Sequence, residues 1–380
     1  MKILADQNIP YVAQAFGDLG EVRLMPGRDI RRQHLRDCQC LIVRTVTRVN
    51  RALLDNTPVE FVGSATIGTD HIDLDYLQSA GIDHSNAAGC NAEAAAEYVV
   101  SGLFALSSRR DLDPFRCRAG IVGYGNVGTR LVDKLETLGI ECRVCDPPLQ
   151  QRGQTVREFV DLDSILRDCD FISLHVPLTR AGEHPTFHLL DRQRLQRLAP
   201  GCLLVNAARG EVVDNRALLA TLEQRPDLSL FLDTWEDEPR VNRELLRRVD
   251  IATPHIAGYS VEGRLRGTQM VLDAACRHFA RKSGWQMSRL LPVAKTIGAT
   301  AAGRGLESWR GLFHEHCDIW RDHDALVAGA EIDDTGFAAH FDGLRRVYPD
   351  RLEYEHCNVD RRITRLPPRI LERLGFRLTG

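Results

Sequence analysis

The chain alternates short apolar runs with amphipathic stretches along most of its length. Runs such as 40–43 and 202–205 are short and apolar, which is typical of strands in a buried parallel sheet. Between such runs lie segments with helical periodicity, for example 127–138, which is followed by Gly139, and 215–223. This alternation predicts βαβ units and a parallel sheet covered by helices on both faces. The predicted strands are 1–5, 40–43, 61–63, 120–122, 141–145, 171–175, 202–205, 228–232 and 250–252.

Three domains are predicted from the arrangement of these elements. Besides a short helix over 74–80, two long helices, over 91–106 and about 261–281, would cross between two α/β domains and make the first one discontinuous. We therefore expect a flavodoxin-like substrate domain from 1–92 and 260–284, and a Rossmann-type doubly wound parallel sheet from 93–259. After residue 284 the pattern changes to patches rich in His and Arg, with fewer βα alternations. This change predicts a C-terminal α+β extension over 285–380.

Composition excludes several classes of protein. The 380 residues are 43% hydrophobic and 27% charged, as in ordinary globular proteins, and the net charge of −3 favours neither nucleic acid nor membrane as a partner. No apolar run is long enough for a membrane span and the start lacks a signal-peptide pattern, so we expect a soluble, cytoplasmic protein. Lysine is absent between Lys134 and Lys282, which excludes a Schiff-base lysine there, and no P-loop occurs. The Arg-rich tail is expected to be solvated or at an interface, with nucleic-acid binding as the alternative.

Cysteine and histidine patterns indicate no metal site. The eleven cysteines have no framework spacing, which favours reduced thiols. Cys142 and Cys145 lie three apart on a predicted strand, so their side chains should point to opposite faces. His314 and His316 are two apart on a predicted helix and would face different directions.

A dinucleotide-binding motif follows the strand at 120–122. Gly123, Gly125 and Gly128 form G-x-G-x-x-G, with Asn126 and Val127 opening the next helix. The first glycine permits a tight turn, the second lets the backbone approach a pyrophosphate, and the third allows close packing of helix on strand. Asp146 ends the next strand, where a carboxylate accepts hydrogen bonds from ribose hydroxyls and repels a 2′-phosphate. These residues predict NAD as the cofactor, rather than NADP.

Three complementary groups follow three successive predicted strands. Arg209 follows 202–205, Glu238 follows 228–232 and His255 follows 250–252. Each alone is more often structural, but ligands bind at the carboxyl ends of such strands. We expect Arg209 to anchor a substrate carboxylate, His255 to act as the base and Glu238 to fix the His255 tautomer.

Together these motifs resemble the D-isomer-specific 2-hydroxyacid dehydrogenase family, in which the residues matching Arg209, Glu238 and His255 are catalytic. The segments 206–210, 233–239 and 253–258 carry the resemblance, and Gly68–Asp73 matches the first-domain signature. An end-to-end match to one branch of this family includes the segments 1–6, 43–47, 89–92, 255–259 and 344–349. That branch implies a homodimer through the extension, and NAD-dependent oxidation of 4-phospho-D-erythronate to 2-oxo-3-hydroxy-4-phosphobutanoate in pyridoxal 5'-phosphate biosynthesis.

The resemblance also implies individual contacts. Thr45, Thr66 and Tyr259 would touch substrate. Contacts with NAD are implied for Asp146, Asp233, Gly258 and the backbone at Ala207, Ala208 and Arg209. His175 lies near the cofactor without an assigned contact.

Two questions stay open at the level of sequence. Candidates for the substrate phosphate are Arg44, and Arg345 or Arg346 from the extension, since phosphate prefers arginine forks. The alternatives for function are another 2-hydroxy acid, such as 3-phosphoglycerate, and a non-catalytic NAD-sensing regulator on the same fold.

Overall fold

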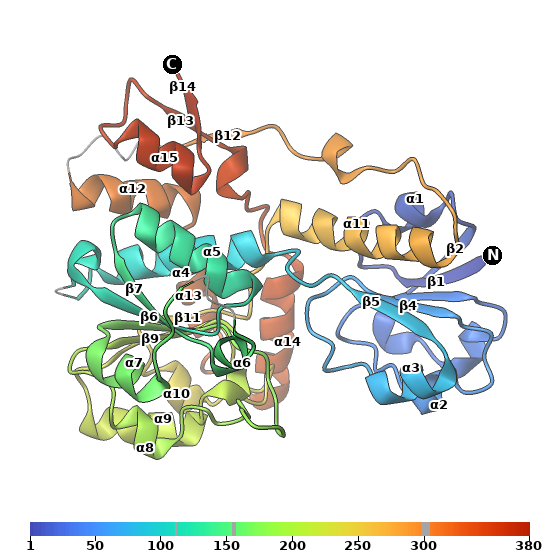
Figure 1. Cartoon of the computed structure of the whole chain (residues 1–380), viewed down its shortest axis with the longest axis horizontal. Helices are drawn as coiled ribbons and strands as arrows, with labels where there is room; N and C mark the ends of the chain where they lie inside the picture. Colours follow the sequence, from blue (N-terminus) through green and yellow to red (C-terminus); the bar gives the residue numbers. More distant parts are fainter. Residues whose placement is uncertain (111, 154–156, 298–304) are drawn as a thin grey trace. The chain divides into compact units, whose positions relative to one another are not determined.

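Contacts divide the chain into two compact units. The computed structural model describes residues 1–110, 112–153, 157–297 and 305–380. Unit 1 consists of Met1–Asn91 and Ser260–Pro292, and unit 2 of Ala92–Tyr259 and Val293–Gly380 (Figure 1). The chain therefore leaves unit 1 before helix α4 and returns to it before helix α11. The predicted third domain, beginning at residue 285, stays a prediction.

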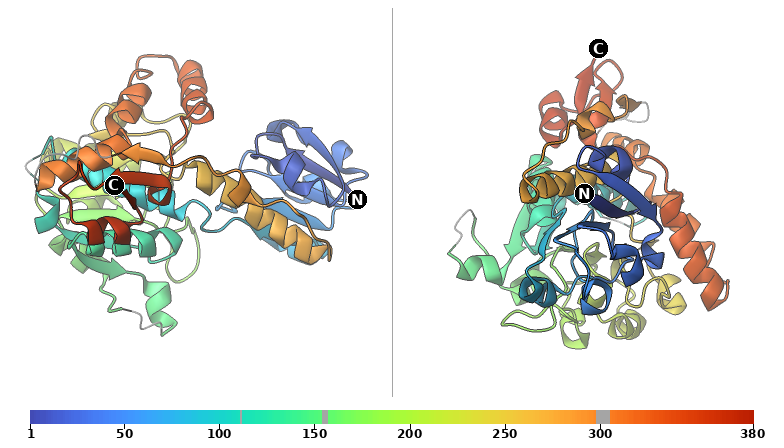
Figure 2. Two further views of the ribbon diagram at one scale, coloured as in Figure 1. Left: turned by 90° about the horizontal axis from the view of Figure 1, so that it is seen from above. Right: turned by 90° about the vertical axis from the view of Figure 1, so that its right-hand side faces the viewer.

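Unit 1 contains a parallel five-stranded sheet with the order β2-β1-β3-β4-β5, which is the order of a flavodoxin-like fold, the fold that was predicted for this domain. Its helices cover both faces: α1 and α11 pack with one apolar cluster, whereas α2 and α3 pack with the other. In Figures 1 and 2, α11 runs along the sheet of this unit. The approach is close, because a Cβ built on Gly63 of β4 would lie 2.3 Å from Val271 of α11. The elements are β1 (Lys2–Asp6), α1 (Val12–Phe16), β2 (Glu21–Met25), β3 (Cys40–Val43), α2 (Arg51–Leu54), β4 (Phe61–Ser64), α3 (Leu74–Ala80), β5 (Asp83–Asn86) and α11 (Val261–His278).

The larger sheet of unit 2 has six parallel strands in the order β11-β10-β9-β8-β6-β7. The chain starts at β6, adds β7 on one side and then β8 to β11 on the other, so the doubly wound Rossmann-type prediction is confirmed. The elements are α4 (Ala92–Leu106), β6 (Arg118–Val122), α5 (Asn126–Thr137), β7 (Glu141–Cys145), α6 (Pro147–Gln151), α7 (Leu162–Asp168), β8 (Phe171–Leu174), α8 (Arg192–Leu195), β9 (Leu203–Asn206), α9 (Asn215–Gln224), β10 (Ser229–Leu232), α10 (Arg243–Leu246) and β11 (Ile251–Ala252).

Successive residues of these strands belong to two separate apolar cores. Phe171 of β8 packs with α4 and α5, whereas Ile172 packs with α7 to α10 on the other face. Cys142 and Cys145 likewise fall in different clusters, so the prediction that they face opposite ways is confirmed. Burial on both faces explains why the inner strands of this sheet, such as β8 and β9, are largely apolar in sequence.

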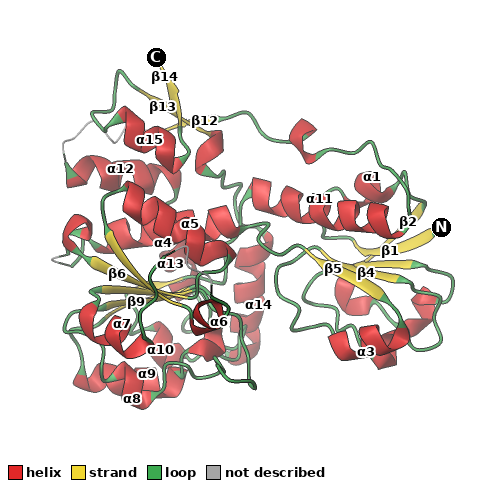
Figure 3. Ribbon diagram, in the orientation of Figure 1, coloured by secondary structure: helices red, strands yellow, loops and turns green. Residues whose placement is uncertain are grey.

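The described residues between 293 and 380 add a small parallel sheet and the helices α12 to α15 to unit 2 (Figure 3). The sheet order is β12-β13-β14, and its side chains join the apolar core that α4 and α5 cover. None of the described helices of the chain has the length and apolarity that a bilayer span requires. The elements are β12 (Lys295–Ile297), α12 (Leu306–His316), α13 (Ile319–Val327), α14 (Asp334–Arg346), β13 (Cys357–Asp360), α15 (Pro368–Leu374) and β14 (Arg377–Thr379).

Candidate active site

The glycine-rich loop connects β6 to α5 at the point where the strand order reverses. Gly123 has φ +95°, which L side chains rarely adopt, and a Cβ there would lie 2.5 Å from the His175 carbonyl oxygen. A Cβ on Gly128 would lie 2.0 Å from the Gly123 carbonyl oxygen, so helix and strand pack as closely as predicted. A Cβ on Gly125 would meet no atom within 4 Å, apart from its chain neighbours. Gly125 also begins α5 without a side-chain cap, so its first N–H groups suit a pyrophosphate.

Asp146 follows β7 beside this loop. One carboxylate oxygen accepts a hydrogen bond from the Tyr124 backbone N–H at 2.8 Å, and the other accepts from the Leu149 N–H at 3.0 Å, capping α6. The side chain therefore fixes the shape of the glycine-rich loop. Its predicted contact with ribose stays a prediction.

His175 follows β8 and is also at this edge. Its N–H donates to the Val122 carbonyl at 2.7 Å, and its Nε2 lies 2.8 Å from the Ser173 hydroxyl. Burial lowers the pKa of His175 to about 3, so the ring is neutral at physiological pH. Among the described residues its buried Nδ1 has no hydrogen-bond partner.

The three predicted catalytic residues follow three neighbouring strands. Asn206 of β9 is paired with Leu232 of β10, and Leu232 with Ala252 of β11, so these strands end in one row. The loops that carry Arg209, Glu238 and His255 therefore leave the sheet at the same edge.

The turn carrying Arg209 packs directly on the loop carrying Glu238. The Asn206 amide donates to the Arg209 carbonyl at 2.8 Å, and its oxygen accepts from the Ala208 N–H at 3.1 Å. A Cβ on Gly210 would lie 1.9 Å from the carbonyl carbon of Trp235, three residues before Glu238. The Arg209 guanidinium donates to the Ala208 carbonyl at 2.8 Å.

Glu238 and His255 form the central pair of the site. The Glu238 Oε1 lies 2.5 Å from the His255 Nδ1, and the side chains are 27% and 30% exposed. The other Glu238 oxygen accepts from the Trp235 N–H at 3.4 Å. Burial alone would raise the pKa of Glu238, but His255 and Arg345 oppose it, so the pKa lies below its ordinary value. The carboxylate is therefore ionised and holds the imidazole by one nitrogen.

Asp233 holds the turn that carries His255. Its carboxylate accepts from the Thr253 hydroxyl at 2.6 Å and from the N–H groups of Ile256 and Ala257 at 2.8 and 3.0 Å. The His255 N–H donates to the Asp233 carbonyl, and His255 has φ +55°, in the left-handed region. The side chain of Asp233 is 1% exposed. The predicted contact between Asp233 and NAD stays a prediction.

The residues predicted to bind substrate in unit 1 follow adjacent strands of its sheet. Val43 of β3 is paired with Ser64 of β4, and Arg44, Thr45 and Thr66 come just after this pair. The Arg44 Nε donates to the buried Asp6 carboxylate at 2.9 Å. The Thr66 hydroxyl lies 2.8 Å from the Ser64 hydroxyl. Arg44 is thus held by a carboxylate that sequence reasoning did not single out.

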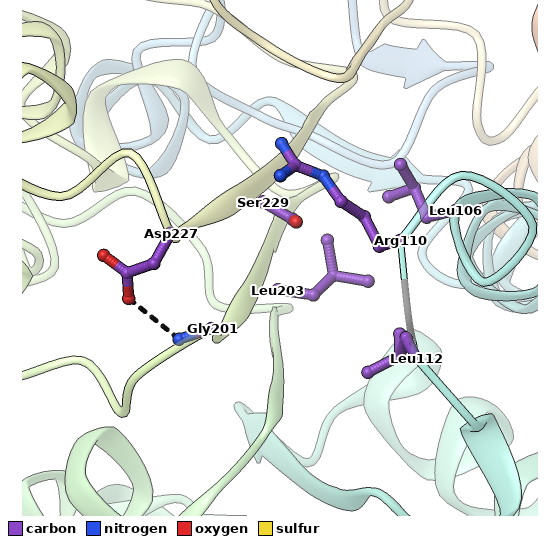
Figure 4. Close-up of a pocket in the computed structure, with 7 residues that line it drawn as sticks. All are labelled: Leu106, Arg110, Leu112, Gly201, Leu203, Asp227 and Ser229. Carbon is purple, nitrogen blue, oxygen red and sulfur yellow. Dashed lines mark hydrogen bonds between the residues drawn. The ribbon is translucent and has the colours of Figure 1, made fainter.

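Two further features of the described residues were not part of the predicted site. His188, Asp214 and Glu236 approach one another closely enough to hold a metal ion, but His188 and Glu236 are hydrogen-bonded at 2.6 Å and the Asn215 N–H donates to Glu236. A pocket at the opposite end of the strands is lined where β9 and β10 begin, and Figure 4 shows that Asp227 there accepts from the Gly201 N–H. The residues that line this pocket are Leu106, Arg110, Leu112, Gly201, Leu203, Asp227 and Ser229.

Comparison with known proteins fits this geometry. Residues 90–257 match the model of the D-isomer specific 2-hydroxyacid dehydrogenase, NAD binding domain. The chain is 48% identical over 361 residues to an erythronate-4-phosphate dehydrogenase from Stutzerimonas stutzeri, and the match covers 94% of each protein. The chain belongs to the erythronate-4-phosphate dehydrogenase family. A relative of the same name from Cronobacter sakazakii is 43% identical and matches 100% of this chain and 99% of its own length.

Members of this family are NAD-dependent oxidoreductases, and so is this chain. Solved structures with the same fold include the NAD-bound 3-phosphoglycerate dehydrogenase of Entamoeba histolytica. It has a TM-score of 0.64 and 23% identity, over 74% of this chain and 95% of that one. The D-lactate dehydrogenase of Aquifex aeolicus has a TM-score of 0.59 and 23% identity, over 74% and 96% of the two chains. The remaining 26% of the chain is therefore not shared with these structures.

Proposed function

We propose that the chain oxidises the C2 hydroxyl of 4-phospho-D-erythronate to give 2-oxo-3-hydroxy-4-phosphobutanoate, with reduction of NAD, in pyridoxal 5'-phosphate biosynthesis. The observation that carries the proposal is the Glu238–His255 pair at the carboxyl edge of the sheet that also bears the glycine-rich loop. The choice of substrate is supported by the relatives, which are named erythronate-4-phosphate dehydrogenase.

NAD fits the residues at the glycine-rich loop, because the space at Gly125 is open and the start of α5 has no side-chain cap. We expect its pyrophosphate at Gly123–Gly128, its ribose at Asp146, and further contacts at Ala207–Arg209, Asp233 and Gly258. When bound, NAD would provide the nicotinamide ring that accepts a hydride.

His255 serves as the base in this proposal. Its Nδ1 is held by the Glu238 carboxylate, so the Nε2 is the atom that takes the proton of the C2 hydroxyl. As that proton leaves, the hydrogen on C2 departs with its electron pair and the C2 carbonyl forms. The ionised Glu238 stabilises the imidazolium that results.

Arg209 anchors the other end of the reacting group. A guanidinium offers two parallel donors, which match a carboxylate. The hydrogen bonds from Asn206 hold the turn in which Arg209 lies. Arg209 thereby fixes the carboxylate of the 2-hydroxy acid relative to the His255 loop.

Substrate contacts in unit 1 are part of the same proposal. We infer that Thr45 and Thr66 bind the substrate and that Arg44 takes its phosphate, with Tyr259 of unit 2 as a further contact. Arg44 is suited to an anion because it is 32% exposed and is held at its Nε by Asp6.

We also propose a homodimer formed through residues 285–380, in the cytoplasm. Exposed large apolar side chains in this region support it: Val293 and Val347 are 94% and 71% exposed, and Ile332 and Ile363 are 41% and 43% exposed. Burying such side chains against a second copy removes apolar surface from water.

The test is NADH formation by the purified chain with a panel of 2-hydroxy acids. The panel contains 4-phospho-D-erythronate, unphosphorylated D-erythronate, 3-phosphoglycerate and D-lactate. The proposal expects the highest kcat/KM for 4-phospho-D-erythronate. A higher value for 3-phosphoglycerate would reassign the substrate, and NAD binding without turnover of any acid would favour a regulator.

A further inference from the structure

The turn that follows His255 is held by an arginine almost a hundred residues away in the chain. Arg351 lies in the segment after α14, and its Nε donates to the Tyr259 carbonyl at 3.0 Å. Its Nη2 donates to the Ala257 carbonyl and, at 3.3 Å, to the Ala94 carbonyl in α4. Arg351 is only 6% exposed.

Arg351 and Asp233 hold the same turn through different groups. Asp233 accepts from the N–H groups of Ile256 and Ala257, whereas Arg351 donates to the carbonyls of Ala257 and Tyr259. Backbone groups of both kinds are thus fixed within four residues of His255.

Arg351 is itself set in a buried polar network. Its guanidinium carbon lies 4.6 Å from the centroid of the Tyr98 ring. The hydroxyls of Tyr98 and Tyr348 both donate to the Asp322 carboxylate, at 3.0 and 2.9 Å. Because Asp322 and Tyr348 come from the C-terminal region and Tyr98 from α4, this network connects that region to α4.

The same segment also reaches the other members of the site. The Tyr348 ring packs edge-on against Tyr259, with centroids 6.0 Å apart. The guanidinium carbon of Arg345 lies 5.8 Å from the centroid of the Tyr259 ring, and Arg345 helps to keep Glu238 ionised. Three side chains between 345 and 351 therefore flank Tyr259.

We propose that Arg351 is a positioning residue for the dehydrogenase reaction, which fixes the Ala257–Tyr259 turn and thereby the orientation of His255 and Tyr259 toward the substrate. The proposal rests on the proposed function. A buried cation is costly unless its hydrogen bonds are satisfied, and here they go to the Ala257 and Tyr259 carbonyls of the active-site turn, to the Ala94 carbonyl and to the Cys317 sulfur. A lysine has no planar fork and cannot reproduce this set of bonds.

The experiment compares Arg351→Met and Arg351→Lys with the exposed control Arg369→Met. NAD-binding sites per chain are counted by fluorescence titration, and kcat and KM are measured per binding site. The isotope effect on kcat with substrate deuterated at C2 is measured as well. Misplacing a catalytic group by about 1 Å can cost about 10²-fold in rate.

The proposal expects Arg351→Met to lose about 10- to 100-fold in kcat per binding site, with the Kd for NAD within about twofold of wild type. The kcat per binding site of Arg351→Lys should lie between those of Arg351→Met and wild type. The isotope effect on kcat should rise in both variants, because the chemical step becomes slower. A purely structural role would lower the number of binding sites and leave kcat per site and the isotope effect unchanged. That result in either variant overturns the proposal.

Failure of the proposed function can be distinguished from failure of the Arg351 proposal, because the proposed function is tested by the turnover of the wild type alone. If the wild type turns over a different 2-hydroxy acid, the same comparison on that acid tests Arg351. If the wild type turns over none, the positioning role is overturned together with the function. The control Arg369→Met should match wild type in every readout.

Discussion

Gly210 lies against Trp235 so closely that a methyl group on its Cα would overlap the backbone: the ideal Cβ stands 1.9 Å from the Trp235 carbonyl carbon and 2.4 Å from the Glu236 nitrogen. This contact brings the Arg209 turn onto the loop that ends at Glu238. Because the obstacle is backbone, it cannot rotate away as a side chain could.

Gly210→Ala should therefore separate the Arg209 turn from the Glu238 loop. We expect about 1–3 kcal/mol lower stability and a loss of about 10²-fold in kcat. Urea unfolding and NADH formation measure the two effects. As a control, Gly343→Ala in α14 meets nothing within 4 Å and should raise stability by about 0.5–1 kcal/mol. Wild-type kcat in Gly210→Ala would contradict the prediction.

His255→Ala removes the proposed base. We expect kcat to fall by about 10²–10⁴-fold, because a positioned base contributes that much, while NAD still binds. Steady-state NADH formation and fluorescence titration of NADH measure these quantities. The exposed His314→Ala is the matched control. Turnover near that of wild type would remove His255 from the base role.

Arg44→Ala tests the phosphate contact. Since Asp6 holds Arg44 at the carboxyl edge of the sheet of unit 1, its loss should raise KM for 4-phospho-D-erythronate by about 10-fold or more, as for other charge-assisted contacts. The KM for unphosphorylated erythronate should change little. Arg48→Ala, on the same loop, is the control. An equal effect on both substrates would mean that Arg44 does not bind the phosphate.

Glu97 should make stability fall with rising pH. Burial raises the pKa of this carboxyl to about 8, and Lys134 only partly opposes the shift. The folded state then holds a proton that the unfolded state has lost, so the free energy of unfolding decreases from about pH 5 until pH passes 8. Burial lowers the pKa of His316 to about 3, so this residue changes the free energy of unfolding at lower pH than Glu97 does. Buried thiols such as Cys40 and Cys202, whose pKa burial also raises, contribute equally to wild type and to a Glu97 variant, so the difference between the two proteins from pH 6.5 to 8.5 isolates Glu97.

In that window Glu97→Gln, which mimics the protonated group, should lose less stability than wild type, by about 1 kcal/mol or more. Urea unfolding at several pH values measures the slope. Ser101→Ala changes a neutral group on the same helix and should keep the wild-type slope. Parallel slopes for Glu97→Gln and wild type would contradict the assignment.

The buried strands were predictable from sequence because burial on both faces leaves a continuous apolar run. β3 and β7 begin and end at the predicted residues, as does α3. The edge strands β2 and β5 were missed, because β2 is largely exposed and β5, Asp83–Asn86, is polar throughout. Neither of these two strands carries an apolar run, so periodicity does not find them, whereas the edge strand β7 was found although it is partly polar.

For the site, sequence predicted that Glu238 and His255 meet, because both follow strands of a parallel sheet. It did not single out Arg351 or the Asp6 carboxylate that holds Arg44. Arg351 follows no strand and acts through its contacts with backbone carbonyls, which leave no spacing signal in one sequence. Asp6 ends β1, so the same strand-end argument could have found it.

The interleaving of the two units has a consequence for biosynthesis on the ribosome. One core of unit 1 needs Val271 and Leu272 of α11, which emerge only after the whole six-stranded sheet has been translated. The apolar cluster of unit 2 that α4 and α5 cover is likewise completed by Phe313 and Tyr354, which are translated later still. The N-terminal strands must therefore persist with one face covered only by α1 during synthesis of most of the chain, the period in which such intermediates are most prone to aggregate or to require a chaperone.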